Sequence, residues 1–324
     1  MRQDRRHVIG DVSICGSFIL APMAGITDAA MRILCAGMGA SLTYTEMVSA
    51  KALHYNDTKT EKLLYIPESA GKTAIQIFGS DPAIMGEAAR RLNDRKNVIL
   101  DINMGCPAPK VVKNGDGSAL MKDPDLVYDI LREVTSNTDK PVTVKIRKGF
   151  YEKDINAIEV AKAAEAGGAA AVCVHGRTRE QFYRDRADWN IVKAVREAID
   201  IPVIANGDIV DLRSATDALE TTGCELMMVG RAAIGNPWIF KELKAGFDGE
   251  TYVRPSIDEK SRVMHKHLDM LIDLKGEMCA VREMRKHVAW YVKGMKNAAR
   301  IRETVNHIES AEEMKEVLRF EAQR

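Results

Sequence analysis

The amino-acid sequence predicts an α/β fold, a (βα)8 TIM barrel followed by a small all-helical C-terminal domain. Eight short runs rich in Val, Ile, Thr and Met occur before residue 235, and segments with a helical pattern separate them. Nearly every run ends in a polar or Gly/Pro-containing stretch. Apolar strands that alternate with helices are typical of a parallel sheet covered on both faces, and barrel enzymes carry their chemistry at the carboxyl ends of the strands.

The eight predicted strands fall at regular intervals along the chain. In order they are "FILAPMAG", "LTYTEMV", "TAIQIFG", "VILDINMG", "PVTVKIR", "AAVCVHG", "PVIANGD" and "LMMVGRA". Eight units in about 230 residues have the size of a (βα)8 barrel. A doubly wound open sheet is the alternative, but no G-x-G-x-x-G follows the first strand, and that fingerprint marks dinucleotide-binding sheets of this kind.

Three of the intervening helices can be placed, two of them by their capping residues. A helix over 82–92 follows Ser80 or Asp81 as its cap, with Pro82 at the first helical position. A second helix, over 155–166, opens behind Asp154 and ends at two glycines, and a third covers 189–198.

The character of the sequence changes after "GNPWIF". We predict a barrel over residues 1–245, a linker over 246–256 and a helical domain over 257–324, because no strand-like run occurs in the last segment. Residues 282–302 hold seven basic side chains against the single acid Glu283, with His287, Trp290 and Tyr291 among them. The two aromatic residues either stack on a ligand or belong to the helix core.

Composition limits the possible classes of function. The chain has 324 residues, 46% of them hydrophobic, enough for a full core. Its formal net charge is only +1, so a polyanion partner would have to bind a local cluster. Six cysteines show no metal-ligand spacing, and no apolar run approaches the ~20 residues of a membrane span. We therefore expect no metal, no membrane and a cytoplasmic location.

The stretch "DINMGCPAPK" places Cys106 just beyond an apolar strand. Either the turn happens to contain a cysteine, or the thiol is placed to react. In the neighbouring strands, Gln76 and Lys145 interrupt apolar runs. Gln76 either binds a ligand or is satisfied by nearby backbone, and Lys145 either faces an anionic ligand or snorkels on the outer face of the barrel.

The ends of the last three strands indicate a phosphate-bearing ligand. His175, Arg177 and Arg179 follow the sixth strand and make one rim positive together with Lys145, Arg147 and Lys148. Exposed backbone amides at glycine turns after the last two strands are a common phosphate site in barrels, and such turns occur here at Gly207 and Gly230. Flavin mononucleotide (FMN) fits these features, with Lys145 stabilising negative charge on the reduced ring.

Taken together, these stretches resemble the tRNA-dihydrouridine synthases, most closely their bacterial B-type subfamily. The matching segments are "APMAGITDAAMR", "TEMVSAKAL", "IQIFGSDP", "DINMGCPAPKVVKNGDGSALMKDP", "VTVKIRKGF", "VHGRTREQFY", "PVIANGDI", "VGRAAIGNPWIF" and "MRKHVAWYVKG". They span nearly the whole chain. One departure is Asp116, where a small residue is expected.

The resemblance implies a flavin-dependent oxidoreductase that reduces uridine to 5,6-dihydrouridine in the D-loop of tRNA, with NADPH or NADH as reductant. Hydride from reduced FMN would reach C6 of the flipped base, and Cys106 would give a proton to C5. It also assigns roles by position. The residues implied to bind FMN are Pro22, Met23, Ala24, Gln76, Lys145, His175, Asn206, Gly207, Asp208, Gly230 and Arg231. Those implied or predicted to meet the base or tRNA are Asn103, Arg147, Arg177, Arg179, Arg285, Lys286, Lys293 and Arg300.

Two other functions remain open at this point. A small-molecule FMN oxidoreductase of the dihydroorotate dehydrogenase type would use the same barrel but would not need the basic helical tail. A non-catalytic tRNA-binding factor would not need Cys106, Lys145 or the two glycine turns. The oligomeric state stays open.

Overall fold

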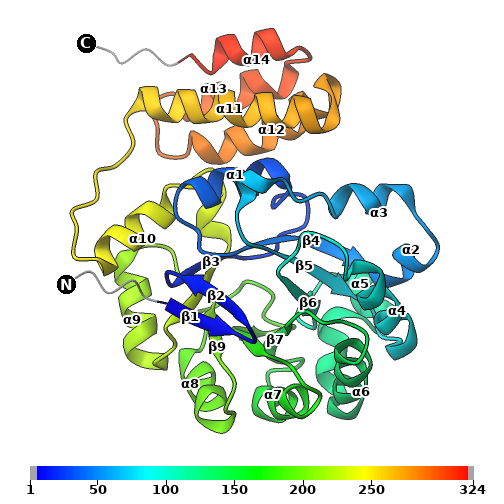
Figure 1. The fold of residues 1–324 in the computed structure, drawn as a ribbon. Coiled ribbons are helices and arrows are strands. Elements are labelled where there is room, and N and C mark those ends of the chain that lie inside the picture. Colours follow the sequence, from blue (N-terminus) through cyan, green and yellow to red (C-terminus); the bar gives the residue numbers. More distant parts are fainter. Residues whose placement is uncertain (1–5, 320–324) are drawn as a thin grey trace.

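The computed structural model describes residues 6–319, and in it eight parallel strands form a nearly closed barrel (Figure 1). The strands are β3 (Phe18–Leu20), β4 (Thr43–Ser49), β5 (Thr73–Phe78), β6 (Ile99–Asn103), β7 (Val142–Gly149), β8 (Ala171–Thr178), β9 (Val203–Asn206) and β10 (Leu226–Val229). Each lies within one of the predicted runs or overlaps it, so the TIM-barrel prediction is confirmed. Between β3 and β4 the ring is completed by a single bridge, with the Leu20 amide 2.9 Å from the Leu42 carbonyl.

Helices surround the barrel. They are α1 (Ala29–Gly37), α2 (Ala50–His54), α3 (Thr58–Leu63), α4 (Pro82–Leu92), α5 (Pro109–Lys113), α6 (Pro124–Thr135), α7 (Ala157–Ala166), α8 (Trp189–Ala198), α9 (Leu212–Thr222) and α10 (Ile239–Phe247). Three short 3₁₀ turns accompany them: η1 (Glu68–Ala70), η2 (Gly117–Lys122) and η3 (Arg231–Ala233).

The predicted helices 82–92 and 189–198 are confirmed, and Asp81 rather than Ser80 caps the first, accepting from the Ile84 amide at 3.1 Å. The third prediction is wrong at its start. Helix α7 begins after Asn156, because Asp154 forms an antiparallel bridge with Tyr151 and cannot act as the cap.

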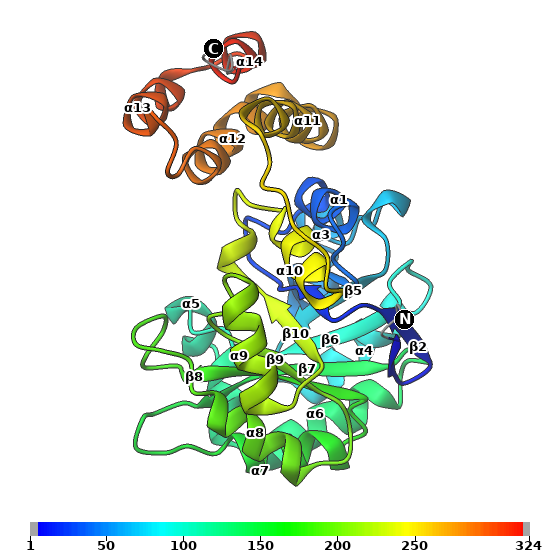
Figure 2. The same cartoon turned by 90° about the vertical axis from the view of Figure 1, so that its left-hand side faces the viewer.

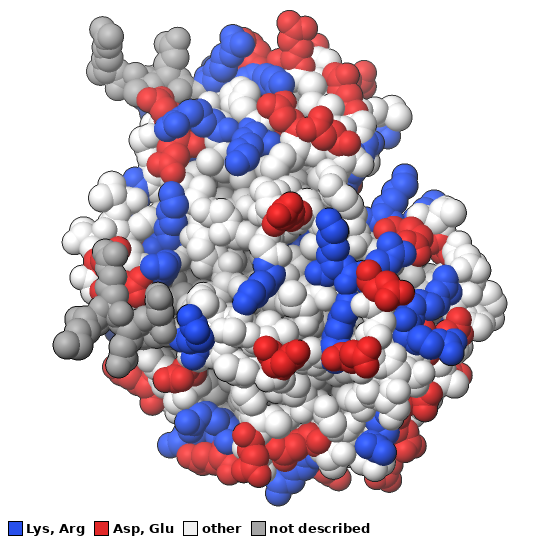
Figure 3. Space-filling model, viewed as in Figure 1, with Lys and Arg blue, Asp and Glu red and all other residues white. Residues whose placement is uncertain are grey.

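A two-stranded hairpin that the sequence analysis did not predict closes the amino-terminal end of the barrel. Its strands, β1 (Arg6–Ile9) and β2 (Val12–Cys15), bury Ile9 and Ile14 against the first residues of the barrel strands. Figure 3 shows the molecule from the hairpin side, where positive and negative side chains are interspersed. Because Ile9 and Ile14 pack into the amino-terminal end of the barrel, the hairpin closes the end opposite the one that carries the polar strand ends.

Four helices follow the barrel after a connecting segment without helix or strand, residues 248–256 (Figure 2). They are α11 (Ile257–Lys275), α12 (Glu277–Tyr291), α13 (Ala298–His307) and α14 (Ala311–Val317). Helix α10 extends to Phe247, two residues beyond the predicted end of the barrel at 245. The predicted domain ranges also include residues 1–5 and 320–324, which lie outside the described part of the chain. The helices pack on α1 and α10 through Ala30 and Trp238, whose indole Nε1 donates to Glu259 at 2.8 Å.

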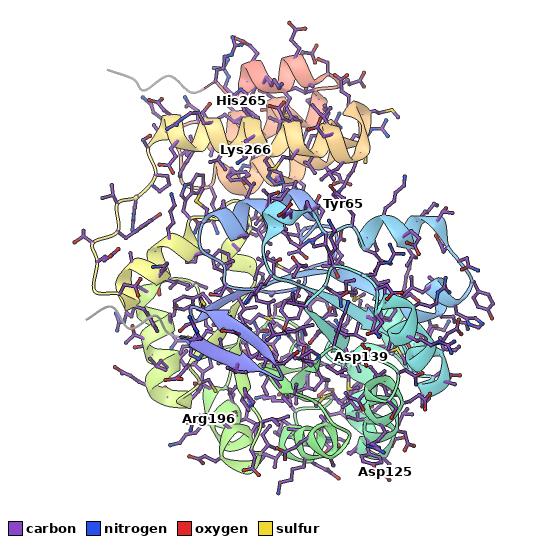
Figure 4. The ribbon with its side chains drawn as sticks, viewed as in Figure 1. Tyr65, Asp125, Asp139, Arg196, His265 and Lys266 are labelled. Carbon is purple, nitrogen blue, oxygen red and sulfur yellow. The ribbon has the colours of Figure 1, made fainter. Side chains whose placement is uncertain are left out.

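Side-chain bonds join the C-terminal helices to one another and fix α1 to the barrel. In Figure 4, His265 lies on the side of α11 that faces α14, and its Nε2 is 2.9 Å from the Lys315 carbonyl oxygen. Tyr65 lies beside α1, and its carbonyl accepts from Arg32 at 2.6 Å. Within residues 6–319, no helix combines the length and the hydrophobicity needed to cross a membrane.

Candidate active site

A cavity of about 470 Å³ lies at the carboxyl ends of the barrel strands. This volume falls in the range of about 300–1,000 Å³ that is usual for small-molecule sites. The structure brings all the residues implied to bind the cofactor together in its walls. They are Pro22, Met23, Ala24, Gln76, Lys145, His175, Asn206, Gly207, Asp208, Gly230 and Arg231. Asn103, Cys106 and Arg147 line it as well.

The turn after β6 presents the Cys106 thiol to the cavity. The Asn103 side-chain oxygen accepts from the Gly105 amide at 3.1 Å and from the Cys106 amide at 2.8 Å, which folds the chain back at the end of the strand. Arg147 Nε donates to the Gly105 carbonyl at 2.7 Å. Partial burial raises the pKa of the Cys106 thiol, outweighing the opposite effects of the Ala108 amide and the nearby cations. The neutral thiol is therefore the dominant form near neutral pH.

Lys145 lies in the middle of β7, between Asn103 of β6 and Cys173 of β8. Its side chain lines the cavity, so the alternative that it snorkels on the outer face is wrong. Among the described residues its amine makes no hydrogen bond or ion pair, and burial lowers its pKa. Arg147 lowers the pKa further, whereas the Asp101 carboxylate raises it. An amine in a cavity wall without a protein partner is suited to an anionic or carbonyl oxygen of a ligand.

A chain of buried hydrogen bonds lies beneath the cavity. Asp101, fully buried, accepts from Thr143 Oγ1 at 2.5 Å and from Gln76 Nε2 at 2.7 Å. The Gln76 oxygen then accepts from Asn103 Nδ2 at 2.8 Å. Burial raises the pKa of Asp101 to about 7, although both hydrogen bonds oppose that shift. Gln76 is thus satisfied largely by protein, mainly by side chains rather than backbone, and retains one N–H for a ligand.

The sequence analysis did not single out Asp101, although a signal was present. A carboxylate in the middle of "VILDINMG" is costly to bury without partners, as a lysine is. The departure at Asp116 has a local explanation, because its carboxylate accepts from the Ser80 hydroxyl of the neighbouring loop.

The ends of β8, β9 and β10 form the opposite side of the cavity. Gly207 has a φ of 116°, and a Cβ there would lie 2.7 Å from Ala187 Cβ and 2.9 Å from His175 Cδ2, so only glycine fits. Burial, together with nearby cations, lowers the pKa of His175 well below its ordinary value, which keeps the ring neutral. The Asn206 amide donates to the Met228 carbonyl at 2.8 Å and joins the two strand ends.

Comparison with known proteins identifies the family. The sequence matches the family model described as "Dihydrouridine synthase (Dus)" over residues 19–324. The chain belongs to the dihydrouridine synthase family. It is 42% identical over 311 residues to "tRNA-dihydrouridine synthase B" of Proteus vulgaris, covering 96% of each chain. It is 39% identical over 300 residues to "Probable tRNA-dihydrouridine synthase" of Rickettsia conorii, covering 92% of this chain and 91% of the relative.

More distant solved structures share the fold. A variant of NCR from Zymomonas mobilis aligns with a TM-score of 0.56 at 16% identity, covering 79% of this chain and 94% of the other. The 6-hydroxypseudooxynicotine amine oxidase of Pseudomonas geniculata N1 aligns with a TM-score of 0.60 at 12% identity, covering 76% and 49%. At these identities the similarity concerns the fold alone.

Two arginines predicted to contact tRNA have other positions in this dihydrouridine synthase. Arg177 is only 2% exposed and binds both oxygens of Asp208, at 2.8 and 2.7 Å. Arg147, also buried, donates to the carbonyls of Gly105, Thr178 and Phe182. The prediction that Arg177 faces tRNA is therefore wrong, because its guanidinium has no surface to offer. Arg147 reaches the cavity wall but is bonded largely to protein.

Asp208 is similarly committed to protein. Besides Arg177 it accepts from the Ala187 amide at 2.7 Å and pairs with Arg231 at 3.3 Å. Arg231 is 48% exposed, and its guanidinium lies 4.6 Å from the centre of the Tyr183 ring. The carboxylate of Asp208 therefore orients Arg231 at the mouth. Tyr183 lines the cavity but was not assigned a role from the sequence, although it ends the motif "VHGRTREQFY".

The helical domain contributes Trp290 to the mouth of the cavity. Trp290 is 40% exposed, whereas Tyr291 is 2% exposed and its hydroxyl is 3.2 Å from His267 Nδ1. The sequence left open whether these two aromatic residues stack on a ligand or belong to the helix core, and each interpretation applies to one of them. Tyr291 belongs to the helix core, and Trp290 is available to a ligand.

The remaining cations predicted to bind tRNA fall into two groups. Lys293 and Arg300 are exposed on the helical domain, and the Lys293 amine lies 5.8 Å from the Trp290 ring. Arg179, Arg285 and Lys286 have contacts within the protein. Arg179 lies over the Phe150 ring at 5.3 Å, Arg285 donates to the Ile308 carbonyl, and Lys286 donates to the Gly25 carbonyl. Residues 6–319 contain no group of three or more His, Cys, Asp or Glu side chains arranged to hold a metal ion.

Proposed function

We propose that this chain reduces uridine to 5,6-dihydrouridine in the D-loop of tRNA, with FMN as its bound flavin and NADPH as reductant. Its family and the names of its relatives support the reaction. The observation that carries the proposal is the pairing of a neutral thiol, Cys106, with an amine that has no protein partner, Lys145, in one cavity. Such a pair suits a reaction that needs both a proton and an electrostatic clamp.

The donor set of the cavity fits a flavin. The positively charged amine of Lys145 would contact the pyrimidine portion of the flavin ring, and the remaining N–H of Gln76 would donate to the same portion. The glycine turns at Gly207 and Gly230, with Arg231, would hold the phosphate. A bound flavin would supply the hydride that adds to C6 of the uracil ring.

Cys106 would complete the reduction. Addition of hydride at C6 leaves negative charge conjugated to the C4 carbonyl of uracil, and a proton must then reach C5. The raised pKa keeps the Cys106 sulfur protonated near neutral pH, so the thiol can act as the general acid. The hydrogen bonds from Asn103 fix the turn and aim the thiol at the cavity.

The tRNA would bind across the helical domain and the mouth of the barrel. A target base has to leave its stack to enter such a cavity, which costs a few kcal/mol. Trp290 at the mouth could stack on the exposed nucleotide, and Lys293 and Arg300 could contact phosphates. NADPH, or NADH in its place, would enter by the same mouth in a ping-pong cycle. We expect the reaction to take place in the cytoplasm, where tRNA is found.

The two alternative functions account for fewer features. A small-molecule oxidoreductase of the dihydroorotate dehydrogenase type has no use for Trp290 at the mouth or for exposed cations beside it. A non-catalytic tRNA-binding factor has no use for an unpaired Lys145 and the Cys106 thiol in the walls of one cavity.

Two measurements test the proposal. The purified protein should be yellow, with the absorbance near ~450 nm of an oxidised flavin. Dihydrouridine should disappear from specific positions of tRNA when the gene is deleted and return with the unaltered gene but not with Cys106→Ala. A colourless protein that gains no flavin on incubation with FMN, or a tRNA pattern indifferent to the deletion, would exclude this function.

A further inference from the structure

The loop after β3 forms one wall of the cavity, and its tip points away from it. Pro22, Met23 and Ala24 line the cavity. The loop is tied internally where the Met23 amide donates to Thr27 Oγ1 at 2.9 Å. Gly25 stands at the exposed tip with a φ of 68°, and neither its amide nor its carbonyl is used within the loop.

Both backbone groups of Gly25 are bound from outside the loop. Its amide donates to the carboxylate of Glu46, from β4, and its carbonyl accepts from the amine of Lys286, from α12 of the helical domain. Partial burial raises the pKa of Glu46, and the Gly25 amide opposes that shift. One side of this clamp therefore belongs to the barrel and the other to the C-terminal domain.

Further contacts join helix α12 to the barrel near Gly25. Lys275 joins Asp28 at 2.7 Å and Glu283 at 2.5 Å, which connects α11 and α12 to the cap of α1. A Cβ on Gly235 would lie 2.5 Å from the backbone of Trp290, so the barrel and the end of α12 are in close contact. Lys286 and Trp290 are four residues apart on one helix and so share a face.

We propose that Lys286 is a positioning residue for the flavin: it holds the tip of the cofactor-lining loop from the helical domain. This inference rests on the proposed function. It also changes the role predicted for Lys286, which becomes a fixed contact between the two domains rather than a phosphate ligand of tRNA. The wall formed by Met23 and Ala24 then depends on a side chain that lies more than 260 positions along the chain.

The test compares four full-length variants. Lys286→Met should weaken FMN binding to the flavin-free protein about 5- to 20-fold, the effect of losing one charge-assisted hydrogen bond at a partly exposed site. Lys286→Arg, which can still donate to the Gly25 carbonyl, should recover most of the affinity. Arg282→Met removes an exposed cation one turn earlier on α12 and should leave FMN affinity unchanged. Lys266→Met, on α11 and without an ion pair among the described residues, is the control for general effects on the helical domain (Figure 4).

FMN affinity, the circular dichroism of the bound flavin and tRNA affinity would be measured for each variant, with far-UV spectra to verify folding. A loss of FMN affinity in Lys286→Met that Lys286→Arg restores supports the inference. Unchanged FMN affinity in Lys286→Met overturns it, whether or not tRNA binding is weakened. If the unaltered protein binds no FMN, the proposed function itself fails, and this outcome is distinct because every variant then behaves alike.

Discussion

The polar groups of the cavity divide into two sets that differ in their partners. Asp101, Gln76, Asn103, Arg147 and Arg177 form a frame in which nearly every charged or amide group is bonded to protein. Cys106 and Lys145 form the open pair, which faces the cavity and lacks side-chain partners among the described residues.

This difference indicates that the frame orients the site and that the open pair carries out the chemistry. A group already bonded to protein cannot change partner cheaply, because a buried donor left unsatisfied costs about 1–3 kcal/mol. The frame therefore fixes the turn and the loops, and the open pair is left to meet ligands. Residue type alone does not reveal whether a side chain is buried in the frame, since Arg177 and Arg231 bind the same carboxylate but are 2% and 48% exposed.

Removing the thiol of the open pair should give the largest effect. Cys106→Ala should lower the rate of dihydrouridine formation about 10²- to 10⁴-fold, because it removes the thiol that we propose as the proton donor to C5. Flavin and tRNA binding should persist, since the turn is held by backbone and by Asn103. Single-turnover assays by mass spectrometry would measure the rate, and unchanged turnover would remove Cys106 as the acid.

The two arginines on Asp208 provide a matched comparison for the frame. Arg177→Met should lower the free energy of unfolding by about 3–5 kcal/mol, because it leaves a buried network without its charge. Arg231→Met, at the exposed partner, should cost less than about 1 kcal/mol of stability and instead weaken FMN binding. Urea unfolding followed by circular dichroism would measure both losses of stability, and equal losses would contradict the assignment of Arg177, but not Arg231, to the frame.

The sequence predicted the barrel well because strand and helix patterns are local. The apolar runs and the caps at Asp81 and Asp188 depend on neighbours in the chain. The helix expected from residue 155 failed at its start because the Tyr151–Asp154 bridge is a local contact without a distinct sequence signal. The hairpin over β1 and β2 was missed because only Ile9 and Ile14 among its strand residues are buried, so its strands lack the continuous apolar run of the barrel strands.

Site residues could be predicted where a reactive or charged side chain interrupts an apolar strand. They could not be predicted where a side chain binds a partner far away in the sequence. Lys145 and Cys106 stand out because an apolar strand has no need of them. Arg177 could not be recognised as buried, since its partner Asp208 is 31 residues away and only the fold brings them together. The same reason hid the contact between Lys286 and Gly25.

A smaller effect is expected from the carboxylate of the frame. Asp101→Leu should reduce the turnover number about 10-fold with little change in KM, because Gln76 loses the acceptor that orients its amide towards Asn103. Asp101→Asn is the matched control, since its oxygen can still accept from Gln76, and it should stay within about 3-fold of the unaltered enzyme. Steady-state kinetics with saturating tRNA would separate the two constants. A Leu variant as active as the Asn variant would show that this carboxylate does not orient the turn.

The smallest effect concerns two buried histidines of the helical domain. The rings of His267 and His287 are 4.5 Å apart in the helical core, and burial lowers the pKa of His267 to about 4 and that of His287 as well. Asp28, Lys275, Glu283 and Lys286 face this pair. Because both pKa values lie below those of the unfolded chain, the histidines contribute full stability above pH ~6.5, and this is lost as the pH falls towards 4. At pH 5.5 the loss should be about 1 kcal/mol per histidine. His287→Phe should therefore reduce the drop in unfolding free energy between pH 7.5 and 5.5 by about 1 kcal/mol, and identical drops in variant and parent would show that the pair does not titrate with unfolding.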